Sequence, residues 1–326
     1  DVDLKWLRAL PFLRQHAVHT HLPQAGDQDA IHASDASPTD NHVMRRTKIV
    51  ATIGPATSDP PAMRRLLEAG ADVVRLNTAH ADPVEHAQRA VEARTIAADL
   101  GRTVGVLVDL PGPKLRSGPV RDGEVELHPG KQFTLTAAAV EGDEHHVSTT
   151  VPALARWVRA GDEIFLADGE IVLVVERIDG DAVRCEIVRG GILRSRKGMH
   201  VPRAEHHVEV FTDADARALT MAIRVKADFV GLSFVRHPED VEAVRALLPK
   251  RGVRPQLVPK IETAVALDHL AGIVAAADAV MVARGDLAVE TAPERVPVLQ
   301  RQIVAAARSA GKPVVAYKLG RSALGQ

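Results

Sequence analysis

Several features that would define whole classes of protein are scarce in this 326-residue sequence. Cys185 is the only cysteine, so no disulfide can form within the chain and nothing suggests secretion. Aromatic residues make up 3% of the chain, so the core must be aliphatic, as in parallel α/β proteins. No apolar run approaches the roughly 18 residues that span a bilayer. Lys and Arg number 41 against 42 Asp and Glu, which gives no basic excess for nucleic acid.

The first 43 residues differ in composition from the rest of the chain. A short amphipathic stretch, residues 4–13, is followed by a tract of Asp, Ala, Ser, Gln and His without sustained periodicity, which predicts a mobile segment. Its closely spaced histidines are better explained as part of a mobile tail than as a metal cluster. The first methionine is Met44. We expect residues 1–43 to be an N-terminal extension, disordered or not native, ahead of a domain that begins at Met44.

From residue 48 onward, short aliphatic runs alternate with stretches of helical periodicity. The runs lie at 48–53, 72–76, 104–109, 228–233, 256–261, 279–283 and 313–316. The helical stretches lie at about 60–69, 83–99, 214–226, 238–248, 264–276 and 294–310. Several helical stretches are followed by Gly, as is common at helix C-termini. This alternation predicts a parallel sheet, either open or closed into a barrel.

Residues 118–200 interrupt this rhythm. Short alternating runs are separated there by the pairs DG, PG, GD, DG and GG, which predicts an all-β insertion made of hairpins. The runs lie at 124–127, 132–135, 163–166, 171–177 and 182–188. The insertion falls between the third and fourth strands of the sheet, where it would overhang the catalytic end of a barrel as a lid. The predicted organisation is a first barrel part at 44–117, a lid domain at 118–200 and a second barrel part at 201–326.

Polar side chains gather at the C-terminal ends of the aliphatic runs. Arg75 and Asn77 form a pair at i and i+2, on one face of a strand, and Lys260 and Glu262 form another. The other polar strand ends are Asp109, Ser233 and the sequence Arg284-Gly285-Asp286. In a (β/α)8 barrel these ends form the active-site rim. Surface charges would be scattered over helices and core positions would avoid charge, so the pattern favours a functional site.

The residue types at this rim point to phosphoryl chemistry. Glu262 and Asp286 suit Mg²⁺ or Mn²⁺, because Mg²⁺ is typically held by one or two carboxylates together with water and substrate oxygens. Lys260 and the arginines would then face anions. A metal with Lys and Arg stabilises a phosphoryl group in transfer, where positioning and charge neutralisation are the main work. A structural ion-pair network between Lys260 and Glu262 is the alternative.

Eight segments resemble the signatures of pyruvate kinases, in that family's order and spacing. They are RRTKIVATIGPAT, GADVVRLNTAHA, DLPGPKLRSG, KGMHVP, DFVGLSFVR, PKIET, VMVARGDLAVE and AGKPVV. The resemblance covers about residues 44–316, and VARGDL with KIE at this spacing is highly specific. It implies a TIM-type (β/α)8 barrel, here incomplete after strand 7, with a small all-β lid domain inserted.

The resemblance also implies an activity and its partners. The reaction would be phosphoryl transfer from phosphoenolpyruvate to ADP, giving pyruvate and ATP in glycolysis, with Mg²⁺ or Mn²⁺ as cofactor. It implies a cytoplasmic enzyme whose full-length relatives are homo-oligomers, with neither nucleic acid nor a membrane as partner.

Matching the family's motifs to this sequence implies a role for each rim residue. Glu262 and Asp286 match the metal ligands, and Asp286 also lies beside the substrate. Lys260 matches the lysine that stabilises the phosphoryl group and the enolate, and Arg75 the arginine that reaches the transferring phosphate. The other matches are His80, Arg116 and Lys197 on the nucleotide side, Gly285 at the substrate carboxylate, Ser233 on the substrate rim, and Asn77 and Asp109 at the monovalent cation.

Two departures from the family pattern concern that monovalent cation. The usual RLNFSHG reads RLNTAHA here, so Ala79 replaces a serine whose hydroxyl binds K⁺. The usual GPEIR reads GPKLR, which places Lys114 where a glutamate is common. An ammonium group there can supply the positive charge of the bound cation. Both changes predict that K⁺ is not required, and a surface lysine without this role is the alternative for Lys114.

The end of the sequence departs further. After KPVV the family continues with an ATQMLESM-like stretch whose threonine relays a proton to the enolate, whereas this sequence reads AYKLGRSALGQ and places Lys318 at the threonine. No eighth strand is recognisable, and seven strands do not close an eight-stranded barrel. We therefore expect a fragment or degenerate relative that aggregates readily and shows little pyruvate kinase activity by itself.

Two other functions fit parts of the pattern. A metal-dependent enolpyruvate lyase or aldolase on the same barrel would use the metal pair and Lys260 equally well, but would leave Arg116 and Lys197 idle. A non-catalytic remnant is favoured by the altered end of the chain. Nucleotide-dependent phosphate transfer separates a kinase from a lyase, and any metal-dependent turnover separates both from a remnant.

Overall fold

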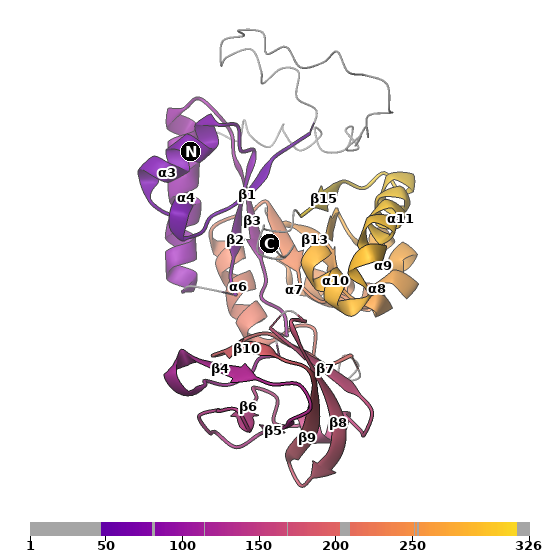
Figure 1. The fold of residues 1–326 in the computed structure, drawn as a ribbon. Helices are drawn as coiled ribbons and strands as arrows, with labels where there is room; N and C mark the ends of the chain where they lie inside the picture. Colours follow the sequence, from indigo (N-terminus) through magenta and orange to yellow (C-terminus); the bar gives the residue numbers. More distant parts are fainter. Residues whose placement is uncertain are drawn as a thin grey trace, which may run out of the picture.

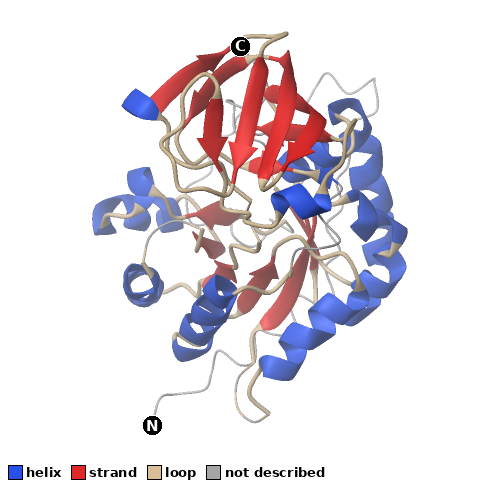
Figure 2. Cartoon of the chain, turned by 90° about the horizontal axis from the view of Figure 1, so that it is seen from below, coloured by secondary structure: helices blue, strands red, loops and turns tan. Residues whose placement is uncertain are grey.

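The computed structural model describes residues 47–79, 82–113, 115–167, 169–202, 209–250, 252 and 254–317. Seven strands form one parallel sheet, and helices surround these strands on the outside (Figure 1, Figure 2). The strands are β1 (Val50–Thr52), β2 (Val73–Asn77), β3 (Gly105–Asp109), β12 (Phe229–Leu232), β13 (Gln256–Ile261), β14 (Val280–Val282) and β15 (Val314–Ala316). Each coincides with one of the seven aliphatic runs, so the strand prediction is confirmed.

The sheet curls into a nearly closed barrel. Its order is β1-β2-β3-β12-β13-β14-β15, so β3 and β12 are neighbours although the β insertion separates them in sequence. β1 and β15 are the two ends of the sheet, and within the described residues neither pairs with a further strand. The prediction of a barrel that is incomplete after strand 7 is confirmed.

The helices that follow the strands also match most of the predicted stretches. They are α3 (Pro60–Glu68), α4 (Pro83–Asp99), α6 (Asp213–Arg224), α7 (Pro238–Leu247), α8 (Ala264–Asp268), α9 (Leu270–Ala276), α10 (Arg284–Glu290) and α11 (Val296–Ser309), with 3₁₀ turns η2 (Pro55–Thr57) and η5 (Pro293–Arg295). The stretch 264–276 forms two helices that meet at His269 rather than one. Helix α10 follows β14 where no helix was predicted. No helix of the described part is both long and apolar enough to cross a membrane.

The barrel strands alternate between two aliphatic clusters. Val106 and Val108 on β3 face the helices and belong to the large outer core. Leu107, between them, faces the barrel interior and packs with Val258 and Met281. Because successive strand residues point to opposite faces, both faces of this sheet are buried, as the continuous aliphatic runs require.

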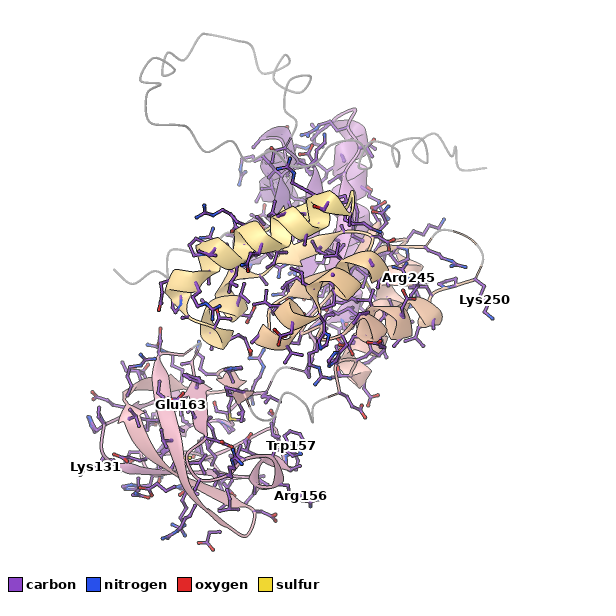
Figure 3. The ribbon with its side chains drawn as sticks, turned by 90° about the vertical axis from the view of Figure 1, so that its right-hand side faces the viewer. Lys131, Arg156, Trp157, Glu163, Arg245 and Lys250 are labelled. Atoms are coloured by element: carbon purple, nitrogen blue, oxygen red, sulfur yellow. The ribbon has the colours of Figure 1, made fainter. Side chains whose placement is uncertain are left out.

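The β insertion forms a separate body with its own aliphatic core; Figure 3 labels Lys131, Trp157 and Glu163 on it. Its elements are η3 (Arg121–Gly123), β4 (Glu124–Leu127), β5 (Gln132–Thr136), β6 (His146–Ser148), α5 (Leu154–Trp157), β7 (Glu163–Leu166), β8 (Ile171–Asp179), β9 (Ala182–Arg189), β10 (Gly191–Arg194) and β11 (Met199–His200). The five predicted runs all form strands.

Hairpins account for only part of the insertion. β7, β8 and β9 are joined as antiparallel hairpins, but β4 pairs with the distant β10, and β5 pairs with β9 and, in parallel, with β6. The prediction of an insertion made of hairpins is therefore wrong in this respect. The turn pairs in the sequence mark local reversals, whereas these longer-range pairings depend on burial of the shared core.

Three aspartates fix the N-terminal ends of barrel strands in the same way. Asp72, Asp228 and Asp278 each follow an alanine just before a strand. Each carboxylate accepts a 2.8 Å hydrogen bond from a backbone N–H at the start of the neighbouring strand, at residues 49, 106 and 257 respectively. Each also pairs with a cation, at Lys48, Arg94 and Arg245. Charge-assisted bonds of this kind hold neighbouring strands in register at the end opposite the rim.

Replacing Asp228 by alanine should lower the free energy of unfolding by about 1–3 kcal/mol, because the N–H of Val106 loses its acceptor and Arg94 loses its carboxylate partner. Urea unfolding followed by circular dichroism measures this. Asp99→Ala is the matched control, because Asp99 is 59% exposed in its ion pair with Arg64 and its loss should cost no more than about 0.5 kcal/mol. Equal effects of the two substitutions would contradict the assigned role of Asp228.

Candidate active site

A cleft of ≈ 770 Å³, partly open to solvent, lies between the β insertion and the C-terminal ends of the barrel strands. The insertion contributes Phe165 and His200 to its walls, and the barrel contributes Phe234, Thr263 and Asp286. The curled sheet brings its strand ends together at this end, so the rim residues that the sequence singles out lie close to one another.

Asp109, at the end of β3, links two cations from opposite directions. Its Oδ2 accepts hydrogen bonds from Arg75 Nε at 2.8 Å and Nη2 at 2.5 Å. Its Oδ1 lies 3.3 Å from Lys260 Nζ. Asp109 is 1% exposed, and Arg75 and Lys260 are each 9% exposed, so all three charges are almost fully removed from water.

Glu262 completes the buried part of the cluster. Its Oε1 lies 3.0 Å from Lys260 Nζ, and its Oε2 accepts a 2.7 Å hydrogen bond from the backbone N–H of Phe234. Within the described residues, Oε1 of Glu262 and Oδ1 of Asp109 are buried without a hydrogen bond of normal geometry. The other oxygen of Asp109 already accepts two bonds from Arg75, so Glu262 Oε1 has the greater capacity for a further positive ligand.

Burial and neighbouring charge set the protonation of this cluster. Burial alone would lower the pKa of Lys260, but Asp109, Glu262 and Asp286 outweigh it and raise that pKa above its usual value. Burial and the Asp286 charge raise the pKa of Glu262 to about 7, against the opposing effects of Lys260 and the Phe234 N–H. Lys260 thus stays charged, whereas Glu262 gains or loses its proton near neutral pH.

The charge balance and donor set fit a divalent cation. Lys260 interacts with the three carboxylates Asp109, Glu262 and Asp286, and Arg75 pairs with Asp109, which leaves one negative charge in excess among these five groups when all are ionised. Among the described residues, no group of three or more His, Cys, Asp or Glu could hold a metal by itself. Glu262 and Asp286 would therefore bind Mg²⁺ only together with water or substrate oxygens, which is its common mode.

Helix α10 places Gly285 and Asp286 at the cleft. It begins directly after β14, at Arg284, so both residues lie in its first turn, where backbone N–H groups have no intrahelical partner. Arg284, Gly285 and Asp286 follow a strand end, as predicted, but the helix was not predicted, because seven residues show too few turns for a helical period.

A buried loop after β3 is fixed by contacts from two later elements. Ser233 Oγ donates to the carbonyl of Leu110 at 2.6 Å, and the N–H of Gly112 donates to Asp215 Oδ1 at 2.8 Å. Gly112 has φ +65°, and a Cβ there would lie 2.6 Å from Ser233 Cβ, so only glycine fits. This loop leads to Lys114, which lies outside the described residues, as do His80 and Lys318.

Other matched residues lie at the base of the insertion or at the end of a barrel strand, outside the buried cluster. Arg116 bridges to Gly198, and Ser117 donates to the carbonyl of Lys197, so Arg116 and Lys197 lie side by side at the base of the insertion. Asn77 Oδ1 accepts from the N–H of Ala79 at 3.2 Å, within its own loop.

A pair that the sequence analysis missed joins the insertion to the barrel. His200 Nδ1 on β11 lies 2.8 Å from Glu290 Oε1, at the last residue of α10, and the Glu290 side chain is 5% exposed. His200 also packs against the ring of Phe165. One helix thus carries both Asp286 and the contact to the insertion. KGMHVP was noted for its lysine alone, and nothing local pairs its histidine with Glu290.

Comparisons with known proteins agree on one family. The family model described as "Pyruvate kinase, barrel domain" matches residues 44–319. The pyruvate kinase of Corynebacterium glutamicum is 41% identical over 271 residues, and that of Mycobacterium tuberculosis strain H37Rv is 42% identical over 271 residues. Each alignment covers 83% of this chain and 57% of the relative, so the chain spans little more than half the length of these relatives.

A solved structure gives the same result. The crystal structure of a pyruvate kinase from Cryptosporidium parvum superposes with a TM-score of 0.77 at 30% sequence identity, covering 85% of this chain and 58% of that chain. The likeness thus extends over the barrel and the β insertion.

Proposed function

Because this chain belongs to the pyruvate kinase family, we propose that its barrel rim binds phosphoenolpyruvate and a divalent cation and transfers the phosphoryl group to ADP, giving pyruvate and ATP. The observation that carries the proposal is the buried cluster of Arg75, Asp109, Lys260 and Glu262 beside Asp286. Buried charges at this density are costly unless they are paired or bind a ligand.

Two residues are assigned to the metal, and two others to the phosphoryl group that is transferred. Glu262 and Asp286 would hold Mg²⁺ or Mn²⁺, which would neutralise phosphoryl charge when bound. Arg75 and Lys260 would face the phosphoryl oxygens, and Lys260 would also stabilise the negative charge left on the enolate oxygen when the P–O bond breaks. Asp109 holds both buried cations in position. Their side chains therefore need not move as negative charge develops in the transition state.

The remaining residues are assigned to the substrate or to the nucleotide by where they lie around the cleft. Gly285 and Ser233 would lie on the substrate side. Arg116 and Lys197, whose neighbours Leu115 and Gly198 line the cleft, would face the nucleotide phosphates, together with His80. In this assignment the donor and acceptor phosphates would meet within the cleft, as in-line transfer between them requires.

The test is ATP formation from phosphoenolpyruvate and ADP, measured by luciferase luminescence, which detects slow turnover. We expect a weak signal that requires both Mg²⁺ and ADP. Consumption of phosphoenolpyruvate without ADP would favour a lyase instead. ATP at the level of a protein-free blank would contradict the proposal for this chain.

K⁺ should have little effect on this activity. Asp109 is committed to Arg75 and Lys260 through both oxygens, and Asn77 Oδ1 is bonded within its own loop, so neither carboxylate nor amide is free for a monovalent cation. Initial rates in K⁺ and in tetramethylammonium at equal ionic strength, which keeps screening constant, should agree within about threefold. Lys114→Glu should restore dependence on K⁺. A tenfold or larger gain with K⁺ in the unmodified chain would contradict the assignment.

A further inference from the structure

Tyr317 lies at the C-terminal end of β15, beside the buried cluster. Its backbone N–H donates to the carbonyl of Val282 at 3.2 Å, which continues the pairing of β15 with β14. Its ring centroid lies 4.8 Å from the guanidinium carbon of Arg75. The sequence analysis gave Tyr317 no role, because it lies in the segment that departs from the family pattern.

The contact joins opposite ends of the sheet. Arg75 is on β2, next to the first strand, whereas Tyr317 follows β15, the last. Arg75 Nη1 also donates to Thr52 Oγ1 on β1 at 3.0 Å, and its other bonds go to Asp109 on β3. The guanidinium is therefore bonded to residues of the two neighbouring strands, β1 and β3, and Tyr317 reaches it across the gap that the open sheet leaves between β15 and β1.

The geometry limits what Arg75 can offer a ligand. Three of its five N–H groups are used by Asp109 and Thr52, so at most two can reach an anion. The guanidinium carbon of Arg75 lies over the Tyr317 ring, so the ring limits where the guanidinium can move. Such contacts are stronger when the cation is desolvated, and Arg75 is 9% exposed. The ring therefore opposes rotation of the guanidinium away from its present plane.

We propose that Tyr317 is a positioning residue of this site, whose ring holds Arg75 in the orientation that presents its unused N–H groups to a phosphate or phosphoryl group at the rim. The identity of the anion in catalysis rests on the proposed function, but the contact and its effect on phosphate binding do not. A residue that merely filled the gap would act equally well as an aliphatic side chain, which makes the aromatic ring the testable element.

Tyr317 is the only tyrosine in the chain, so 3-fluorotyrosine labelling of the full chain gives one ¹⁹F resonance from this position. We expect that resonance to move and saturate as inorganic phosphate is added. The movement should be lost in Arg75→Lys, which keeps the charge but not the planar group. Arg245→Lys is the matched control: Arg245 lies on α7, away from the rim, where it pairs with Asp278, and the phosphate response should persist (Figure 3).

A second comparison leaves Arg75 intact and removes no charge. Phosphate affinity, measured by ³¹P NMR line broadening, should change by less than twofold in Tyr317→Phe and weaken about fivefold in Tyr317→Leu. Tyr317 is 40% exposed, so neither substitution should disturb the fold, and circular dichroism checks this. If Arg75→Lys does not fold, this pair decides the question.

The outcomes separate this inference from the proposed function. Unchanged affinity in Tyr317→Leu, no ¹⁹F response to phosphate, or a response that persists in Arg75→Lys would each overturn the role of Tyr317, even in a chain that makes ATP. A phosphate response that depends on Arg75 and on the ring, in a chain that makes no ATP, would support the positioning role while the proposed function fails.

Discussion

Lys260→Met is expected to lower kcat for ATP formation by about 10²-fold or more, with KM for phosphoenolpyruvate and Mn²⁺ affinity changed by less than about threefold. Lys260 is 9% exposed, and its ammonium group lies within 3.3 Å of both Asp109 and Glu262. Its charge matters most where negative charge moves from the phosphoryl group to the enolate oxygen, which is in the transition state. Methionine keeps most of the side-chain length without the charge.

This substitution also leaves two buried carboxylates without their shared cation, which costs stability. Lys312→Met is the matched control for a lost lysine. Lys312 Nζ donates to the carbonyl of Ala277 at 2.7 Å, at the opposite end of the barrel strands from the rim. Both variants are compared by thermal unfolding, and kcat is measured below the lower transition. A loss confined to KM, or an equal loss of kcat in Lys312→Met, would contradict the role of Lys260.

Strands and rim residues were predictable because their signals are local. A run such as 256–261 is largely aliphatic because β13 is buried on both faces, and its charged residues come at the C-terminal end, with Lys260 in the strand and Glu262 directly after it. Spacing of two residues in a strand is enough to place both side chains on one face. The sequence therefore predicted which residues meet at the rim, and the structure brings Arg75, Asp109, Lys260 and Glu262 into one cluster.

Contacts between residues that are far apart in the sequence were not predictable, because only the folded chain brings them together. His200 contacts Glu290, and Tyr317 contacts Arg75, each from an element far away in sequence. The same limit explains the pairing of β4 with β10, which no turn signal encodes. A carboxylate such as Asp109 was matched to a cation ligand by its motif, but only the three-dimensional arrangement shows that Arg75 and Lys260 occupy both its oxygens.

Glu262→Gln is expected to weaken Mn²⁺ binding by about 10²-fold or more, to the limit of detection by electron paramagnetic resonance titration. In the proposed metal site the protein ligands are Glu262 and Asp286, so a neutral amide removes half of the anionic donor set. Glu290→Gln is the matched control, because Glu290 is a buried carboxylate on the same helix as Asp286 but pairs with His200. Its Mn²⁺ affinity should stay within about twofold of that of the unmodified chain.

The pH dependence of Mn²⁺ binding gives the same prediction an independent test. Burial raises the pKa of Glu262 to about 7, and a metal binds the carboxylate rather than the acid, so below that pH binding must displace a proton. Because the protonated form predominates on the acid side, affinity should rise by about tenfold from pH 6 to pH 8 and level off above. Glu262→Gln should flatten this profile, while Glu290→Gln should retain it. Unchanged Mn²⁺ affinity in Glu262→Gln, or a profile of unchanged steepness, would show that the cation binds elsewhere.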